Sequence, residues 1–589
     1  MDPQIQVSLI ILILLGVLVW GRWRYDGVTL AALASMVLLG LVPAKEAFLG
    51  FGHPAVITVA LVLLISKALE KSGFINMIGD LLRQKVSGEM QFLIILMLVA
   101  GVLSSFMNNI GAMAMLLPIT IGIAQKMEWN PSKFLMPLAF ASILGGMNTK
   151  IGTPPNIIIS EFREDYSNQS FEFFDFAFAG LPISILGILF IAFVGWRFVK
   201  LREEGSEKIP LVDIQDYLVE MTISEDSTLV GKRIHELTSE LGTDNVLMGV
   251  VSEKGTIRRP HHRETFEALQ ILVLKISPDD VAGVQTEFGL IIDPDLQDPS
   301  QLGELGEIEA MITPRSRLIG RKYNYFKRMS RGVLALLGLW RQGTKLRRRL
   351  AREIFKAGDV LLLSARDNDE NVAEKLELFG LMPLWQRELD VIRDTSRAWQ
   401  ALLIFVVALV AVIFFKVNIL VAFLICVLAY ASRRLLTGEG IYRHIEWPVV
   451  VMLGAMIPIG GALTSSGLTV ASADFITANL SGVNVMWVLV VILVFTMFIS
   501  DLINNAATAV IMAPLSMQVA QQMNHPIEPF LMAVAVGASC AFLSPIGHQC
   551  NTLVMGPGNY RFGDYWKLGL PLEILIVCIS IPVIMNTWF

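Results

Sequence analysis

Two pairs of adjacent asparagines stand inside apolar stretches of the sequence, where their side chains could bind a ligand. Asn108-Asn109 lies within "SFMNNIGAMAML", and Asn504-Asn505 lies within "SDLINNAATAVIM". A carboxamide has an acceptor end and a donor end, so it can contact a cation through its oxygen and an anion through its N–H groups. Polar groups at such positions are costly in lipid, so we expect each pair to lie at a turn lined by protein or water.

Two more polar stretches interrupt apolar sequence. They are "GGMNTKIGTPPN" (Gly145–Asn156) and "SPIGHQCN" (Ser544–Asn551), and their glycines and prolines cannot sustain a helix. A broken helix leaves free N–H groups, which attract anions, and free carbonyl groups, which attract sodium. The sequence therefore predicts two re-entrant hairpins that turn at the asparagine pairs and two broken helices, all four meeting at mid-membrane depth.

Three ionisable residues are expected close to this meeting point. Lys150 binds the anion, neutralises Asp501, or lies at the periphery with its ammonium group at the membrane surface. His548 either titrates near neutral pH or is a packed, hydrogen-bonded imidazole. No nucleophile–base set and no cluster of metal ligands stands out, so the sequence does not favour an enzyme.

Composition indicates the elements that must hold these residues. The chain has 589 residues, of which 54% are hydrophobic, and several apolar runs reach the roughly 20 residues that cross a bilayer. The pattern is typical of a polytopic α-helical protein of the cell (inner) membrane. A net charge of −5 spread over such a chain does not suggest binding to nucleic acid.

One stretch, from Leu201 to about Arg397, is charged and has no run that could span a membrane. Lys and Arg residues flank it, which favours a cytoplasmic location by the positive-inside rule. Within it, Val219–Leu237 parallels Ile308–Phe326, and each copy leads to a strand-like run. We expect an inserted soluble α/β domain pair and four domains: membrane repeat 1 (1–200), modules 1 (201–295) and 2 (296–397), and membrane repeat 2 (398–589).

The two membrane halves are repeats of one another. The stretch that begins at Asn108 aligns with the one that begins at Asn504, and "IGTPPN" aligns with "IGHQCN". After its third apolar run, half one carries Lys71, Arg83 and Lys85, whereas the matching stretch of half two, residues 466–484, has no Lys or Arg. The copies therefore face opposite sides of the membrane, and inverted-topology repeats are characteristic of secondary transporters.

With these motifs in place, the chain resembles the divalent anion/sodium symporter family of the ion transporter superfamily. The stretch Ser544–Leu572 resembles a branch of bacterial permeases that carry cytoplasmic regulatory domains, among which sulfate transporters are found. The inserted units resemble the C-terminal module of potassium-channel regulators, which in relatives dimerises and sometimes binds small ligands. The family's hairpin tips usually read Ser-Asn-Thr; here only the central asparagine of each is kept, which favours a smaller oxyanion over a dicarboxylate.

The resemblance implies a set of binding residues. The first sodium site should use Ser104, Ser105, Asn109 and the backbone near Gly145, and the second should use Ser500, Asn505 and the backbone near Ile503 and Leu543. The substrate should contact Asn109, Asn505 and Pro545, and our expected substrate site adds Asn108, Lys150, Thr153 and Asn504.

The function that this reading predicts is sodium-coupled secondary transport of a small divalent anion by alternating access. Sulfate is the first expected substrate and a dicarboxylate the second. Proton coupling through Asp501 is the alternative mechanism, and a ligand-gated ion channel is the rival class. We expect sodium as the coupling ion, no prosthetic group, a homodimer in the lipid bilayer, and a cyclic dinucleotide or nucleotide as the regulatory ligand of the insert.

Overall fold

The chain folds into two compact units. The computed structural model describes residues 2–20, 23–74, 77, 79, 88–127, 129–199, 217–232, 246–251, 257–258, 265–276, 278–291, 305–313, 316–330, 334–341, 353–366, 371–385, 395–436, 445–479 and 482–589. One unit comprises Met1–Lys200, Ile392–Val554 and Tyr560–Phe589, and the other comprises Leu201–Val391 and Met555–Asn559. The expected boundary between the two modules at 295/296 lies outside the described residues, as do Arg83 and Lys85.

Seven helices of the first unit are long and apolar enough to cross a membrane, among the residues described. They are α1 (Pro3–Trp20), α5 (Glu89–Phe106), α9 (Asp175–Phe193), α14 (Thr395–Phe414), α17 (Trp447–Ser465), α19 (Val485–Leu502) and α23 (Tyr565–Trp588). Their composition is apolar on all faces, which is typical of helices that meet either lipid or other helices all round.

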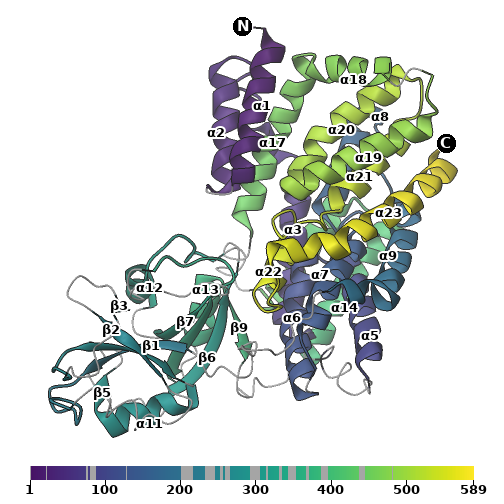
Figure 1. Cartoon of the computed structure of the whole chain (residues 1–589). Coiled ribbons are helices and arrows are strands. Elements are labelled where there is room, and N and C mark those ends of the chain that lie inside the picture. The colour runs from purple at the N-terminus through teal and green to yellow at the C-terminus, as the bar shows by residue number, and fades with distance from the viewer. Residues whose placement is uncertain are drawn as a thin grey trace. The chain divides into compact units, whose positions relative to one another are not determined.

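Further helices belong to the described part of the unit (Figure 1). They are α2 (Tyr25–Leu38), α3 (Pro54–Lys71), α6 (Asn109–Lys126), α7 (Ser132–Gly146), α8 (Pro154–Ser167), α15 (Ile419–Ser432), α18 (Leu468–Asn479), α20 (Asn505–Gln522), α21 (Glu528–Ser539) and α22 (Gln549–Met555). Pro154 and Pro155 open α8 instead of interrupting it. Proline is well suited to the first helical positions because the N–H groups there have no partner within the helix.

Each asparagine pair sits where one helix ends and the next begins. Helix α5 ends at Phe106 and α6 starts at Asn109, while α19 ends at Leu502 and α20 starts at Asn505. Each of these four helices has 18 residues, which corresponds to about 27 Å. Half of a hydrocarbon core is only about 15 Å, so the depth of the two turns stays a prediction.

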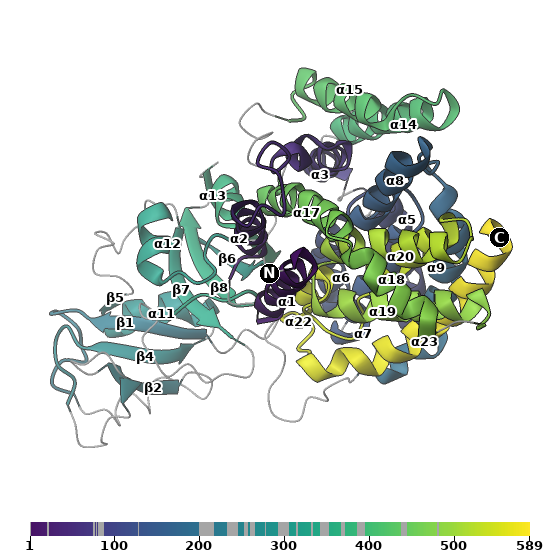
Figure 2. The ribbon, with the colours of Figure 1, turned by 90° about the horizontal axis from the view of Figure 1, so that it is seen from above.

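The first two helices of each half pack against the third helix of the other half. Helix α2 packs on α17, and α15 packs on α3. Figure 2 shows α14 and α15 together at one edge of this unit, with α3 beside them. Two apolar cores lie at these contacts between the halves: one contains both Met36 and Met456, and the other contains both Leu64 and Phe423.

The remaining helices surround α7 and α21. Every residue of α7 from Phe134 to Gly146 is buried, and so is every residue of α21 from Pro529 to Ser539. Helix α8 packs on α20 and α21, and α9 packs along α23. Residues 147–153 and 540–548, which join α7 to α8 and α21 to α22, are thereby held at the centre of this unit.

Over its described residues, the second unit is built on one nine-stranded antiparallel sheet. Its strands are β1 (Tyr217–Ile223), β2 (Val246–Val251), β3 (Ile257–Arg258), β4 (Ile271–Ile276), β5 (Leu290–Ile291), β6 (Leu305–Ile312), β7 (Leu334–Trp340), β8 (Val360–Arg366) and β9 (Leu381–Trp385). The order is β3-β2-β4-β1-β7-β8-β6-β9, with β5 beside β1. The pairing of β1 with β7 joins both sequence repeats into a single sheet. Helices α11 (Pro278–Phe288), α12 (Tyr323–Ser330) and α13 (Asn371–Phe379) complete the unit.

One buried ion pair of the second unit is notable. Arg341 donates two hydrogen bonds of 2.6 Å to the carboxylate of Asp359, and the Asp359 side chain is 1% exposed. The hydrogen bond with Asp359 raises the pKa of Arg341 above its ordinary value, so the guanidinium group of Arg341 remains protonated. Asp359, directly before β8, is therefore held in place by Arg341, directly after β7.

Candidate ion and anion site

The first hairpin tip gathers the residues expected for the first sodium site. The Ser104 hydroxyl donates a 2.7 Å hydrogen bond to Oδ1 of Asn109, and the Ser105 hydroxyl donates a 3.0 Å bond to the carbonyl of Gly145. A Cβ atom on Gly146 would lie only 2.2 Å from Oδ1 of Asn109, so only glycine allows this approach. Hydroxyl, amide and carbonyl oxygens therefore lie together where α6 begins.

The second tip repeats the central contact. The Ser500 hydroxyl donates a 3.1 Å bond to Oδ1 of Asn505 and a 2.7 Å bond to the carbonyl of Ala538. Ile503 is the C-cap of α19, next to the tip. The N–H of Leu543 donates a 3.0 Å bond to Oδ1 of Asp501, which places Leu543 beside the end of α19. All four residues expected for the second sodium site thus lie at or beside this tip.

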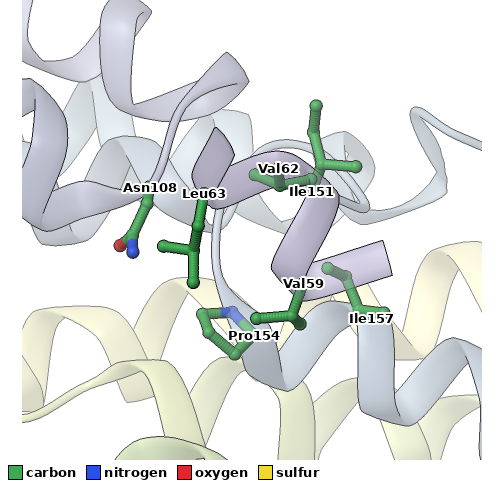
Figure 3. A pocket seen from close by; sticks show the side chains of 7 residues that line it. All are labelled: Val59, Val62, Leu63, Asn108, Ile151, Pro154 and Ile157. Carbon is green, nitrogen blue, oxygen red and sulfur yellow. The ribbon is translucent and has the colours of Figure 1, made fainter. Parts of the chain in front are cut away.

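The outer asparagine of each pair has a different task from the inner one. Oδ1 of Asn108 accepts a 3.3 Å bond from the N–H of Ile110, and Oδ1 of Asn504 accepts a 2.9 Å bond from that of Ala506. These are N-cap interactions, which satisfy backbone donors at a helix start. The inner asparagines are buried, whereas Asn108 is the one polar residue lining a small pocket between α3 and α8 (Figure 3).

The two broken helices are closed by matching hydrogen bonds. Asn156 donates from Nδ2 to the carbonyls of Thr149 at 2.9 Å and Met147 at 3.4 Å. Asn551 donates from Nδ2 to the carbonyls of Ser544 at 3.0 Å and Ala541 at 2.8 Å. In each half, the asparagine that ends the break motif therefore fixes the backbone of that break.

A hydroxyl then ties each break to the hairpin of its own half. The Thr149 hydroxyl donates to the carbonyl of Ser105 and accepts a 3.2 Å bond from the N–H of Gly152. The Ser544 hydroxyl donates a 2.9 Å bond to the carbonyl of Asp501 and accepts a 3.1 Å bond from the N–H of Gly547. These contacts join residues that the sequence alignment places at corresponding positions.

One contact links the first tip to the second break. The carboxamide of Asn109 lies 3.3 Å from Nε2 of His548, and Nδ1 of His548 accepts a 3.1 Å bond from the N–H of Cys550. His548 is therefore buried and hydrogen-bonded, as one of the two expectations for it required. Asn109 therefore lies where the hairpin of one half meets the broken helix of the other.

Three buried polar atoms in this region have no hydrogen-bond partner among the described residues. They are Oγ1 of Thr153, Oδ1 of Asn551 and Oδ2 of Asp501. Buried polar atoms are nearly always paired, so such a group needs an explanation, such as an ion, a proton or a bound molecule. Thr153 belongs to the expected substrate site, and its free hydroxyl is consistent with a contact to the anion. The carbonyl of Pro545, by contrast, already accepts a 2.5 Å bond from Thr552.

Lys150 does not pair with Asp501, contrary to one of the expectations from the sequence. Lys150 is buried, and the charges that act on its ammonium group are those of Glu161, Glu164 and Asp175, all in half one. Lys150 lies just before α8, and α8 carries Glu161. Lys150 is therefore close to carboxylates of its own half. The group beside Asp501 is Glu573 of α23.

Glu573 was not among the site residues expected from the sequence. A carboxylate directly after "LGLPL" in an apolar run is itself a signal, because intramembrane charges are rare and usually functional. The residues that do gather here are hydroxyls, amides and backbone carbonyls, which are ligands for a hard cation such as sodium. Among the described residues, no group of three or more His, Cys, Asp or Glu side chains could hold a metal ion.

Comparisons with known proteins identify the class. The chain is 29% identical to an uncharacterized transporter of Escherichia coli, over 96% of each chain. It is 28% identical to an uncharacterized transporter of Synechocystis, over 99% of this chain and 97% of the relative. A probable sodium/sulfate cotransporter of Chlamydomonas reinhardtii is 25% identical over 57% of this chain and 40% of its own length.

The family whose sequence profile matches is described as citrate transporter, and the match covers residues 15–537 and 477–588. With seven apolar helices long enough to span a membrane in the described part of the chain, and with these relatives, the chain is a multi-pass membrane protein and a transporter rather than an enzyme. This places it in the ion transporter superfamily that the motifs indicated. The chain belongs to the citrate transporter family.

Proposed function

We propose that this protein is a sodium-coupled secondary transporter of a small divalent anion, with sulfate as the first substrate and a dicarboxylate as the second. The observation that carries the proposal is the twin arrangement of Ser104 with Asn109 and of Ser500 with Asn505. In both, a serine fixes the orientation of a buried carboxamide at the start of a helix. Sodium binding at two such places, one in each half, gives a basis for coupling to an anion held between them.

The chemistry of each tip suits both ions. Oxygens of the serine hydroxyl, the asparagine side chain and the nearby Gly145 or Ala538 carbonyl would bind sodium. The remaining N–H groups of the two inner asparagines, with the free hydroxyl of Thr153, would contact the anion. Sulfate is placed first because relatives of this chain bear the name sodium/sulfate cotransporter and because the tips lack the flanking hydroxyls expected for a dicarboxylate.

Two secondary proposals concern regulation and mechanism. The second unit acts as a cytoplasmic regulatory domain of a homodimer and binds a nucleotide or cyclic dinucleotide; its single sheet across both sequence repeats supports treating it as one functional domain. The matched contacts in the two halves favour alternating access over a ligand-gated pore. Proton coupling is the second candidate mechanism, and the carboxyl groups of Asp501 and Glu573 favour it.

The test is uptake into proteoliposomes that contain the full-length protein. Labelled sulfate, succinate, citrate and phosphate are compared with an inward sodium gradient, with potassium in its place, and with a pH gradient alone. Sodium-dependent accumulation of sulfate supports the proposal, and accumulation of citrate or succinate instead corrects the substrate. Accumulation that follows only the pH gradient would refute sodium coupling, and currents far above coupled uptake would indicate a channel.

A further inference from the structure

One stretch of the second unit carries an exposed basic face. Residues 316–330, which include α12, contain five Lys or Arg and no Asp or Glu, although the whole chain has a net charge of −5. All five basic side chains are exposed. The guanidinium group of Arg321 lies over the ring of Tyr325, with its carbon 5.3 Å from the ring centroid, which holds that charge at the start of α12.

A neighbouring segment adds to this positive charge. The N–H of Gly320 donates to the carbonyl of Phe355, and the N–H of Phe355 donates to that of Arg321, both at 2.9 Å. Residues 354–356 therefore lie beside the basic stretch, and Lys356 is exposed there. The α12 basic face comprises Arg317, Arg321, Lys322, Lys327, Arg328 and Lys356.

The nearest acidic side chains of that segment are engaged elsewhere. Glu353 accepts a 3.2 Å hydrogen bond from Arg341, and the buried Asp359 accepts two bonds of 2.6 Å from the same guanidinium group. At the other end of α12, the ammonium group of Lys375 donates a 3.3 Å bond to the carbonyl of Met329. The charge of the basic face is therefore not cancelled by these two carboxylates.

The first sequence repeat has the same local backbone without this charge. There, the N–H of Gly231 donates a 3.0 Å bond to the carbonyl of Phe266, which is the pairing seen in the second repeat. Two exposed residues, Thr228 and Glu267, stand where the second repeat has an arginine and a lysine. The stretch that corresponds to 316–330, residues 227–241, has two basic and two acidic residues. Folding of the repeat therefore does not require the basic face, and its charge needs another explanation.

Apolar side chains are exposed among these charges. Ile319 is 39% exposed and Ile354 is 45% exposed, and they belong to the two segments that lie side by side. Tyr323 and Tyr325 of α12 are partly exposed. Basic residues that surround exposed apolar and aromatic ones are typical of surfaces that bind an anionic membrane, because cations meet the headgroups while apolar groups reach the acyl boundary.

We propose that the α12 basic face binds the phosphate headgroups of anionic phospholipids, with Ile319 and Ile354 at the acyl boundary. The chain joins the second unit to α9 before it and to α14 after it. Such a tether gives the face a high effective concentration at a lipid surface, so even weak contacts would hold. That the leaflet is the cytoplasmic one rests on the proposed location of this unit, whereas lipid binding itself rests on neither that location nor the transported substrate.

The test titrates lipid vesicles against the full-length protein held in nanodiscs of phosphatidylcholine. Vesicles that contain phosphatidylglycerol should bind wild type, and added salt should weaken this binding by screening. The triple variant Arg321→Gln, Lys327→Gln, Arg328→Gln should bind on the order of 100-fold more weakly, because each basic residue near an anionic surface contributes about fivefold. Lys232→Gln, at the position of Arg321 in the first repeat, is the matched control and should keep the wild-type affinity.

Several outcomes would overturn the proposal. They are wild-type affinity in the triple variant, an equal loss in the control, and equal binding to vesicles of phosphatidylcholine alone, which would indicate apolar adhesion without headgroup recognition. Release of the vesicles by inorganic phosphate or a cyclic dinucleotide, at concentrations too low to change the ionic strength, would assign the face to a soluble ligand instead. Ile319→Ser should fold normally, since the side chain is exposed, and should release anionic vesicles at lower salt than wild type. None of these readouts depends on transport.

Discussion

Removing the inner asparagine should cost more stability in half one than in half two, although both changes should impair transport. Asn109 is the acceptor for the Ser104 hydroxyl, and no second acceptor for that hydroxyl is seen among the described contacts. Ser500, which bonds to Asn505, also donates a 2.7 Å bond to the carbonyl of Ala538. The two tips therefore respond differently to the same substitution.

The size of the difference follows from these contacts. Asn109→Ala leaves a buried hydroxyl without its acceptor and removes the contact with His548, so it should lower the free energy of unfolding by about 1–3 kcal/mol more than Asn505→Ala. In Asn505→Ala the serine keeps its bond to Ala538, so the cost is that of one ordinary hydrogen bond, about 1 kcal/mol. Both variants should lose at least tenfold in sodium-dependent uptake, the factor that about 1.4 kcal/mol of binding energy represents.

The assay is thermal unfolding of the full-length variants in detergent, followed by uptake in proteoliposomes. Asn484→Ala is the matched control, because Asn484 is an exposed helix cap far along α19 from the tip. The double variant Ser104→Ala with Asn109→Ala should recover part of the stability lost in Asn109→Ala, since it removes the unpaired hydroxyl. Equal melting temperatures for the two single variants would refute the structural argument, and wild-type uptake in both would refute the site.

Three further outcomes are expected. Arg341→Met leaves the Asp359 carboxylate buried without its partner, which should cost about 3–5 kcal/mol of stability, so limited proteolysis should cut the second unit much faster. Adding Asp359→Asn should restore part of the lost stability, and an unchanged rate of proteolysis in Arg341→Met would contradict this. Lys150→Met with Glu161→Gln removes both buried charges and should keep the melting temperature of wild type while raising the KM for the anion; an unchanged KM would exclude Lys150 from the substrate site. Replacing residues 201–391 by a flexible linker should preserve substrate binding, measured by thermal shift, because both tips and both breaks belong to the other unit; loss of binding in folded protein would show that the second unit completes the site.

The sequence by itself indicated where the chemistry lies. The asparagine pairs and break motifs are recognisable because polar residues in apolar runs have few tolerable positions. The resemblance to the symporter family then implied Ser104 with Asn109 and Ser500 with Asn505 as parts of the two sodium sites. The structure places each of these pairs in hydrogen-bond contact.

Only the tertiary structure decided how the halves meet. The exchange of helix pairs, α2 onto α17 and α15 onto α3, follows from packing between segments hundreds of residues apart, and helices that are apolar all round give no preference for one partner. For the same reason, the sequence left open three roles for Lys150, one of them a pairing with Asp501, whereas the fold turns Lys150 toward Glu161. The position of Glu573 beside Asp501 depends on how α23 crosses α19, a property of the packed bundle that no local pattern encodes.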